Sequence, residues 1–218
     1  MAGRRARPTI WVVAGPNGGG KSSIFGEMVR QAGADYFNPD EYCERLVERN
    51  PGLVRDSANV VAWEVGRRRL EHAIEEGESF AFETTLGGTT MTRLLLRAAE
   101  GGTQTKIWYV ALGSADAHVA RVKARASRGG HDIPEELIRE RYDRSRANLV
   151  RLLPRAAAVK VYDNDVEVDV DAGQPPRLRL VLDVAAGRIR NKKNLASTPA
   201  WAKPIVAAAL KAESHGLH

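Results

Sequence analysis

The sequence predicts an α/β fold, with helices on both faces of a mainly parallel central sheet in three layers. Short apolar segments rich in β-branched and aromatic residues alternate with longer helix-type segments from residue 9 to residue 163. A glycine-rich stretch, VVAGPNGGGKSS (12–23), contains the end of the first apolar segment and then breaks it. Alternating strands and helices form right-handed parallel crossovers, so the polar residues that end the strands should meet along one edge of the sheet.

The predicted elements follow one another in a regular order. A buried strand covers Thr9 to Ala14, and a helix from Lys21 to Ala32 opens at the glycine-rich loop. Further strands are expected at the start of 36–42, in 79–86, 105–112 and 158–163, and further helices after Pro39, in 57–76, in 89–99 and from Pro134. One face of the helix in 57–76 should carry Val60, Trp63, Leu70, Ala73 and Ile74.

Two domain assignments are predicted. Residues 1–165 should form the nucleotide-binding domain, and residues 166–218 should add a C-terminal hairpin and a helix packed on the same domain. In the hairpin, the strand RLRLVLDV turns at Ala185-Ala186-Gly187, and the terminal helix should span Trp201 to Ala212. The fold is therefore expected to close on one core.

The composition favours a soluble, cytoplasmic protein that handles phosphates. The chain has 218 residues, 43% of them hydrophobic, and a net charge of +6, which suits nucleotide phosphates and does not by itself indicate a nucleic-acid partner. Cys43 is the single cysteine, so no intramolecular disulfide can form. The first apolar run, IWVVA, is too short for a signal-peptide core or a membrane span.

The stretch from Gly15 to Ser22 matches the phosphate-binding loop pattern G-x-x-x-x-G-K-[ST] between a strand and a helix. Backbone N–H groups and the helix N-terminus should cradle the β-phosphate, Lys21 should reach the β- and γ-phosphates, and the Ser22 hydroxyl should bind Mg²⁺. Ser23 is expected on the helix surface near the phosphates. The predicted nucleotide-binding set is Gly15, Pro16, Asn17, Gly18, Gly19, Gly20, Lys21, Ser22, Ser23 and Arg121.

The segment from Arg121 to Ser145 predicts a helical lid with arginines for transfer. Gly129 and Gly130 can form a hinge between two helices, and Arg125 and Arg128 lie beside it. The second helix places Arg141 on one stripe with Ile138, Tyr142, Ser145 and Leu149. Arg125, Arg128 and Arg141 are predicted to stabilise charge at the γ-phosphate. The alternative for Arg141 is a surface salt bridge to Glu135 or Asp143.

The candidates for the acceptor side follow two other strands. Asp40 is the predicted proton acceptor for a substrate hydroxyl, with helix N-capping after Pro39 as the alternative role. Glu83 and Thr85 end a buried strand and should contact the substrate or the shell of Mg²⁺, with capping of the next helix as their alternative. Lys21, Asp40 and the three lid arginines therefore form the predicted catalytic set.

Four stretches together, AGPNGGGKSS, NPDE, FETTL and RGGHDIPEELIRERYDRS, resemble the zeta toxin family of P-loop kinases over about residues 10–165. The resemblance implies a P-loop kinase fold, ATP as phosphate donor and an aspartate base matching Asp40. It also implies UDP-N-acetylglucosamine as acceptor, toxicity through blocked cell-wall precursors, and an antitoxin partner that covers the nucleotide site.

One position departs from the family pattern. Gly87 and Gly88 follow ETTL, where the family carries an arginine in the acceptor pocket. The predicted function is therefore ATP-dependent transfer to a small-molecule hydroxyl, with UDP-N-acetylglucosamine as one acceptor. The alternatives are a kinase for a nucleotide, an antibiotic or a nucleic-acid end, and a nucleotide-binding regulator without transfer.

Overall fold

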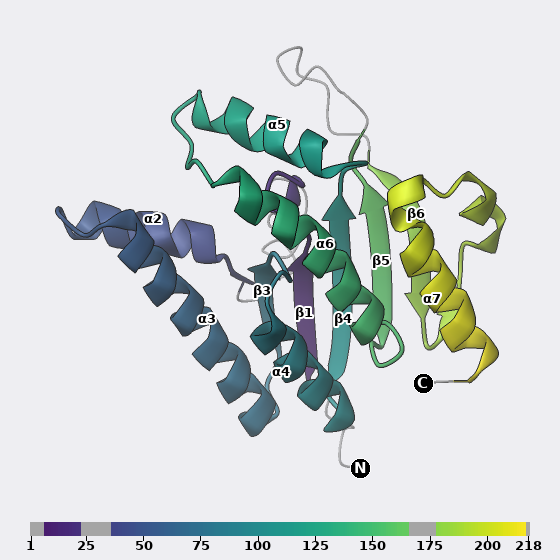
Figure 1. The fold of residues 1–218 in the computed structure, drawn as a ribbon. Coiled ribbons are helices and arrows are strands. Elements are labelled where there is room, and N and C mark those ends of the chain that lie inside the picture. Colours follow the sequence, from purple (N-terminus) through teal and green to yellow (C-terminus); the bar gives the residue numbers. More distant parts are fainter. Residues whose placement is uncertain (1–6, 23–35, 166–177, 217–218) are drawn as a thin grey trace.

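The protein, described here from a computed structural model, is built on a seven-stranded sheet in the order β2-β3-β1-β4-β5-β6-β7 (Figure 1). The structure describes residues 7–22, 36–165 and 178–216. The strands are β1 (Thr9–Ala14), β2 (Tyr36–Phe37), β3 (Phe80–Thr84), β4 (Gln104–Ala111), β5 (Ala158–Asp163), β6 (Arg179–Ala185) and β7 (Arg188–Ile189). The mixed α/β fold with a mainly parallel sheet is as predicted.

The parallel part of the sheet brings the carboxyl ends of its strands together. β1 lies between β3 and β4, all three run in parallel, and Val13 of β1 is opposite Glu83 of β3 and Trp108 of β4. The Gly15 N–H continues this pairing beyond β1 and donates to the Thr84 carbonyl at 3.2 Å. The loop after β1 and the polar end of β3 are therefore neighbours, as the sequence predicts.

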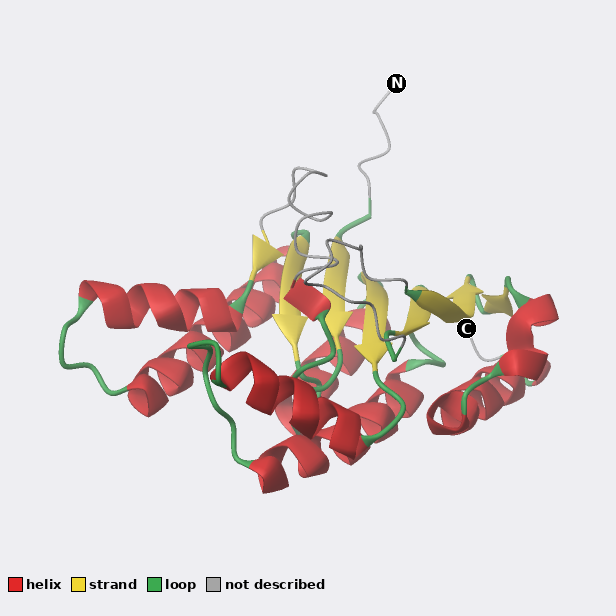
Figure 2. Ribbon diagram, turned by 90° about the horizontal axis from the view of Figure 1, so that it is seen from above, coloured by secondary structure: helices red, strands yellow, loops and turns green. Residues whose placement is uncertain are grey.

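Helices cover one face of the sheet and extend past its edges. They are α2 (Pro39–Arg49), α3 (Arg55–Glu76), α4 (Thr89–Glu100), α5 (Ala115–Ala126), α6 (Glu135–Leu152) and α7 (Lys203–Ser214), with 3-10 helices at Lys192–Ser197 and Ala200–Ala202. In Figure 1, α4 and α6 lie in front of the strands. Seen from above, the α2–α3 pair projects from one edge of the sheet and α7 lies near the other (Figure 2).

Alternate residues of the strands form two apolar clusters. Ile10 and Val12 belong to the main core, while Val13 and Val110 belong to a second cluster on the opposite face. A helix was predicted from Lys21 to Ala32. The chain is helical at Lys21 and Ser22, and the rest of this helix lies outside the described residues.

The predicted apolar face of α3 is wrong in its first half. Leu70 and Ala73 are buried, but Val60 is 67% exposed and Trp63 is 44% exposed. The first half of α3 packs on α2 through the small side chains of Ala58 and Ala62 together with Cys43 of α2. The face of α3 that packs on α2 consists of these small residues, so the larger side chains of Val60 and Trp63 lie outside this contact.

The C-terminal residues extend the sheet. β6 pairs antiparallel with β5, and the hairpin turns at Ala186-Gly187 before β7. Ile205 and Ala209 of α7 belong to the same core cluster as β1 and β4. The tail therefore shares the main core, while the division at residue 165 stays a prediction. None of the described helices has the length and apolar character needed to cross a membrane.

Candidate functional site

The phosphate loop lies against the backbone of β4. Gly15 has φ +142°, and a Cβ at this position would lie 2.0 Å from the carbonyl oxygen of Val110. Only glycine allows the loop to turn here and to lie so close to the neighbouring strand. The first glycine of the motif is therefore required by contact with β4 as well as by the turn.

His118, on α5, supports the loop through a contact that was not predicted from the sequence. Its Nδ1 lies 2.7 Å from the carbonyl oxygen of Asn17, and its Nε2 accepts a hydrogen bond from the Leu112 N–H at 3.0 Å. These partners define the neutral ring with the proton on Nδ1. The side chain is fully buried, and this desolvation lowers the pKa of His118 to about 4.

A second support for the loop comes from the end of β5. The Asn164 side chain donates to the Gly19 carbonyl at 3.0 Å, and the Arg121 guanidinium donates to the Asn164 carbonyl at 2.7 Å. Arg121, predicted as a nucleotide contact, is therefore placed next to the loop. Asn164 was missed, and its place directly after a strand at the predicted edge was the available signal.

Glu83 is the hub of the site. Its Oε2 accepts hydrogen bonds from the Ser22 hydroxyl at 2.8 Å and from the Tyr36 hydroxyl at 2.9 Å. The Lys21 ammonium lies 3.6 Å from its Oε1. Lys21 is buried and also donates to the Pro16 carbonyl at 3.0 Å. A carboxylate and a hydroxyl side by side are oxygen ligands of the kind that Mg²⁺ prefers, so Glu83 and Ser22 fit this ion.

The capping alternative for Asp40 is wrong. The N-cap of α2 is Asn38, whose side-chain oxygen accepts the Asp40 N–H at 2.9 Å, and Pro39 is the first residue of the helix. The Asn38 amide also faces the Ser22 hydroxyl at 3.3 Å. Asp40 itself is exposed, so its carboxylate has no capping duty and is available to the pocket.

One pocket of about 430 Å³ brings six of the predicted residues together. Those among its lining residues are Asn17, Lys21, Asp40, Glu83, Thr85 and Arg141. The Thr84 hydroxyl accepts the Leu86 N–H at 3.0 Å, while α4 begins after Gly88 without a side-chain cap. The alternative that the end of β3 caps α4 is therefore wrong, and Asn148 instead holds this turn through the Leu86 carbonyl at 2.8 Å.

Arg141 points from α6 to the phosphate loop. Its guanidinium donates to the Asn17 side-chain oxygen at 2.9 Å, and burial lowers the pKa of Arg141, against a raising effect of Asp40. The alternative surface salt bridge is wrong, because Glu135 pairs with Lys123 at 2.8 Å and with Arg139. The predicted buried stripe of α6 is confirmed.

The other two predicted lid arginines lie outside the pocket. Arg125 donates to the His131 carbonyl at 3.1 Å, and Arg128 donates to the Ala124 carbonyl at 3.2 Å; both side chains are exposed. They fasten the turn between α5 and α6, while His131 in that turn lines the pocket. Their contact with a γ-phosphate stays a prediction. Ser23 lies outside the described residues.

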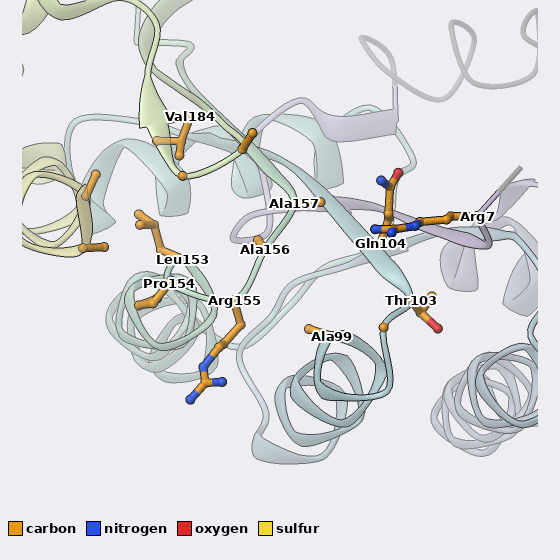
Figure 3. A pocket seen from close by; sticks show the side chains of 15 residues that line it. Arg7, Ala99, Thr103, Gln104, Leu153, Pro154, Arg155, Ala156, Ala157 and Val184 are labelled. Carbon is orange, nitrogen blue, oxygen red and sulfur yellow. The ribbon is translucent and has the colours of Figure 1, made fainter. Parts of the chain in front are cut away.

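A second pocket, of about 250 Å³, lies at the other end of the parallel strands, near their amino ends (Figure 3). Gln104 and Ala157, at the amino ends of β4 and β5, line it together with Arg7 and Arg155. Among the described residues, its lining contains none of the predicted site residues. In parallel sheets, ligands collect at the carboxyl ends of the strands, so the pocket at the phosphate loop is the candidate active site.

Comparison with known proteins gives the same picture. The sequence model of the family described as Zeta toxin matches residues 2–171. An uncharacterized protein of Haemophilus influenzae is 28% identical over 143 residues, which are 62% of this chain and 99% of that protein.

Two solved structures share the fold. The AvrRxo1-ORF1:-ORF2 complex with ATP matches with a TM-score of 0.61 and 15% identity over 90% of this chain, which spans 65% of that one. The PezAT chromosomal toxin-antitoxin system of Streptococcus pneumoniae matches with a TM-score of 0.56 and 12% identity, covering 99% of this chain and 90% of that one. At these identities the likeness shows a shared fold. With a family match over most of its length and this fold, the chain belongs to the zeta toxin family.

Proposed function

We propose that this protein is an ATP-dependent kinase that transfers the γ-phosphate to a hydroxyl group of a small molecule. The observation that carries the proposal is the shared pocket, in which Lys21, Glu83, Asp40 and Arg141 approach one space from four different elements. A protein that only binds a nucleotide needs the loop, but it does not need a carboxylate and an arginine facing the loop.

The loop side of the pocket is the proposed donor site. Backbone N–H groups of the loop after Pro16 bind the phosphates, and Lys21 leaves the Pro16 carbonyl to contact the β- and γ-phosphates. Ser22 and Glu83 would hold Mg²⁺, which neutralises phosphate charge when it is bound. Arg121 lies beside the loop at the end of β5 and is the proposed contact for the rest of the nucleotide.

Asp40 is the proposed proton acceptor. It takes the proton of the acceptor hydroxyl while that oxygen forms a bond to the γ-phosphorus, and the bond between this phosphorus and ADP breaks. Arg141 stabilises the negative charge on the transferred group. Arg125 and Arg128 would join only after the turn between α5 and α6 closes on the nucleotide.

The family suggests a biological setting. We propose a toxin that acts in the cytoplasm, where a single cysteine is easily kept reduced, and a proteinaceous antitoxin as its partner. Support comes from PezAT, which is a toxin-antitoxin system. UDP-N-acetylglucosamine is the acceptor that the family resemblance implies, and we propose no role for nucleic acid.

Asp40→Asn tests the proposal. The variant keeps the shape of the side chain but cannot accept a proton, so acceptor-dependent ADP release should fall about 100-fold while ATP binds normally. The assay contains ATP, Mg²⁺ and a small-molecule cell extract, with calorimetry for ATP affinity. Glu44→Gln, one turn further along α2 and exposed, is the control and should keep full activity.

Two outcomes would contradict the proposal at different levels. Full turnover in Asp40→Asn would show that Asp40 is not the proton acceptor, and Glu83 would be the next residue to test. Absence of any acceptor-dependent ADP from the wild-type protein that binds ATP would favour a nucleotide-binding regulator instead.

A further inference from the structure

The pocket has a second end, away from the phosphate loop, that is formed by one face of α3. Asp56, Asn59 and Trp63 line it, and their spacing of three and four residues places them on the same side of the helix. Thr90 at the start of α4 lines the pocket as well. Since these residues belong to α3 and α4 and not to the loop motif, we call this the α3 end and treat it as the acceptor compartment.

Trp63 offers an aromatic face inside this compartment. The side chain is 44% exposed although it lines a pocket, and it belongs to none of the apolar clusters formed by the described residues. The ring is therefore not used for packing in the core. An accessible indole in a pocket is suited to stack on another ring or on the apolar face of a sugar.

The described lining of the pocket holds more carboxylates than strong cations. The strong cations among the described lining residues are Lys21 and Arg141, and both point to the loop, at the Pro16 carbonyl and the Asn17 side chain. The described lining also carries four carboxylates, those of Asp40, Asp56, Asp132 and Glu83, of which Glu83 lies beside Lys21. His131, on the lid turn, is the remaining basic lining residue among those described.

Gly87 leaves room for the Arg141 side chain. A Cβ on Gly87 would lie 2.8 Å from Cγ of Arg141, so the space of a side chain at this position is filled by Arg141. The guanidinium of Arg141 then turns to Asn17, at the donor side. A phosphorylated acceptor at the α3 end would have to place its phosphates near Asp56, whereas Lys21 and Arg141 make their contacts at the loop.

We propose that the α3 end binds an unphosphorylated alcohol that contains a ring, such as a sugar, an amino sugar or a nucleoside, with zero or positive charge. Its ring lies on Trp63, and its hydroxyl points toward Asp40. This inference rests on the kinase function proposed above and changes the acceptor class from the nucleotide sugar that the family resemblance implies. Like charges repel at short range, so the aspartates select against phosphorylated acceptors.

A panel of paired compounds tests the acceptor class. N-acetylglucosamine is compared with its 1-phosphate and with UDP-N-acetylglucosamine, adenosine with AMP, and kanamycin serves as a cationic ring alcohol. In the presence of ATP and Mg²⁺, kcat/KM should be at least about 10-fold higher for the unphosphorylated member of a pair that reacts. Transfer that prefers the phosphorylated members would overturn the inference and leave the kinase function intact.

Binding is measured in parallel, so that the test does not depend on turnover. Calorimetry with the same compounds should show affinity for unphosphorylated members in the wild-type protein and about 10-fold weaker affinity in Trp63→Ala, with unchanged ATP affinity. Trp63→Phe keeps an aromatic face and should restore most of the affinity. If none of the compounds binds or reacts while ATP binds, both the stacking surface and the acceptor class are wrong.

A charge reversal at Asp56 tests whether local repulsion of phosphates, and not the net charge of the protein, selects the acceptor. Asp56→Arg should raise kcat/KM for phosphorylated acceptors by about 10-fold relative to their unphosphorylated partners. Glu76→Arg makes the same change in net charge at the far end of α3, where the side chain is exposed and does not line the pocket. Equal responses of the two variants would contradict a local role of Asp56.

Discussion

The two ends of the pocket are built in different ways. The donor end is made of backbone that is held by buried polar side chains, with His118 on the Asn17 carbonyl and Asn164 on the Gly19 carbonyl. The α3 end is made of side chains on a helix pair that projects from the sheet, and Trp63 there is 44% exposed. A rigid donor end suits a phosphate chain, and a side-chain-lined acceptor end can change its specificity without change to the loop.

Lys21→Ala should have the largest effect and should act on the donor end alone. Removal of the ammonium group should lower kcat/KM about 1,000-fold and weaken ATP binding, because a charge aimed at the phosphates is lost. The fold should persist, because Glu83 keeps its hydrogen bonds from Ser22 and Tyr36. Calorimetry with ATP and thermal unfolding measure the two effects.

Lys123→Ala, an exposed lysine on α5, is the matched control for Lys21→Ala and should retain ATP affinity. Normal ATP affinity in a folded Lys21→Ala protein would show that the donor end does not lie at the loop.

The pH dependence of stability tests the rigid support under the loop. The pKa of His118 is about 4 in the folded protein and 6.5 in its ordinary state, so the unfolded chain binds a proton that the folded protein excludes in this window. The free energy of unfolding should therefore fall as the pH drops from 6.5 to 4, by about 3 kcal/mol in total. Urea unfolding at a series of pH values measures it.

His118→Gln should remove this pH-dependent loss, whereas His72→Gln, at an exposed position of α3, should retain it. The same pH response in wild-type protein and in both variants would show that the buried imidazole does not cause the loss.

The smallest effects on turnover are expected for substitutions of the lid arginines. Arg141→Ala should lower kcat by about 10- to 100-fold, because Arg141 already faces the loop, while Arg125→Ala and Arg128→Ala should each have a smaller effect. Single-turnover kinetics at saturating ATP, with thermal unfolding as a control, measure the series. Unchanged turnover in all three variants would assign these arginines to the solvated surface.

The phosphate loop between β1 and the following helical turn could be predicted from the sequence because its requirements are local. A strand, a glycine-rich turn and Lys21-Ser22 lie within a few residues of one another, so a short pattern encodes them. The supports could not be predicted, since His118 and Asn17 are 101 positions apart and Arg141 and Asn17 are 124 apart. Such contacts depend on which helix packs next to the loop, and a periodic pattern carries no such information.

The error in α3 has a related cause. Val60 and Trp63 are apolar, so helical periodicity assigns them to the core, but Ala58 and Ala62 allow closer packing of α3 on α2. Packing against α2 therefore decides which face of α3 is buried. Likewise, Asn38 and Asp40 both follow a short strand, and only the structure shows which of them caps α2.

Asn17 links the loop to both helices of the lid through separate atoms, its carbonyl to α5 and its side chain to α6. A movement of α6 that breaks the contact of Arg141 would leave the backbone of the loop still fastened to α5. For the kinase that we propose, ADP could then leave and ATP could enter while the Asn17 carbonyl keeps its contact with His118.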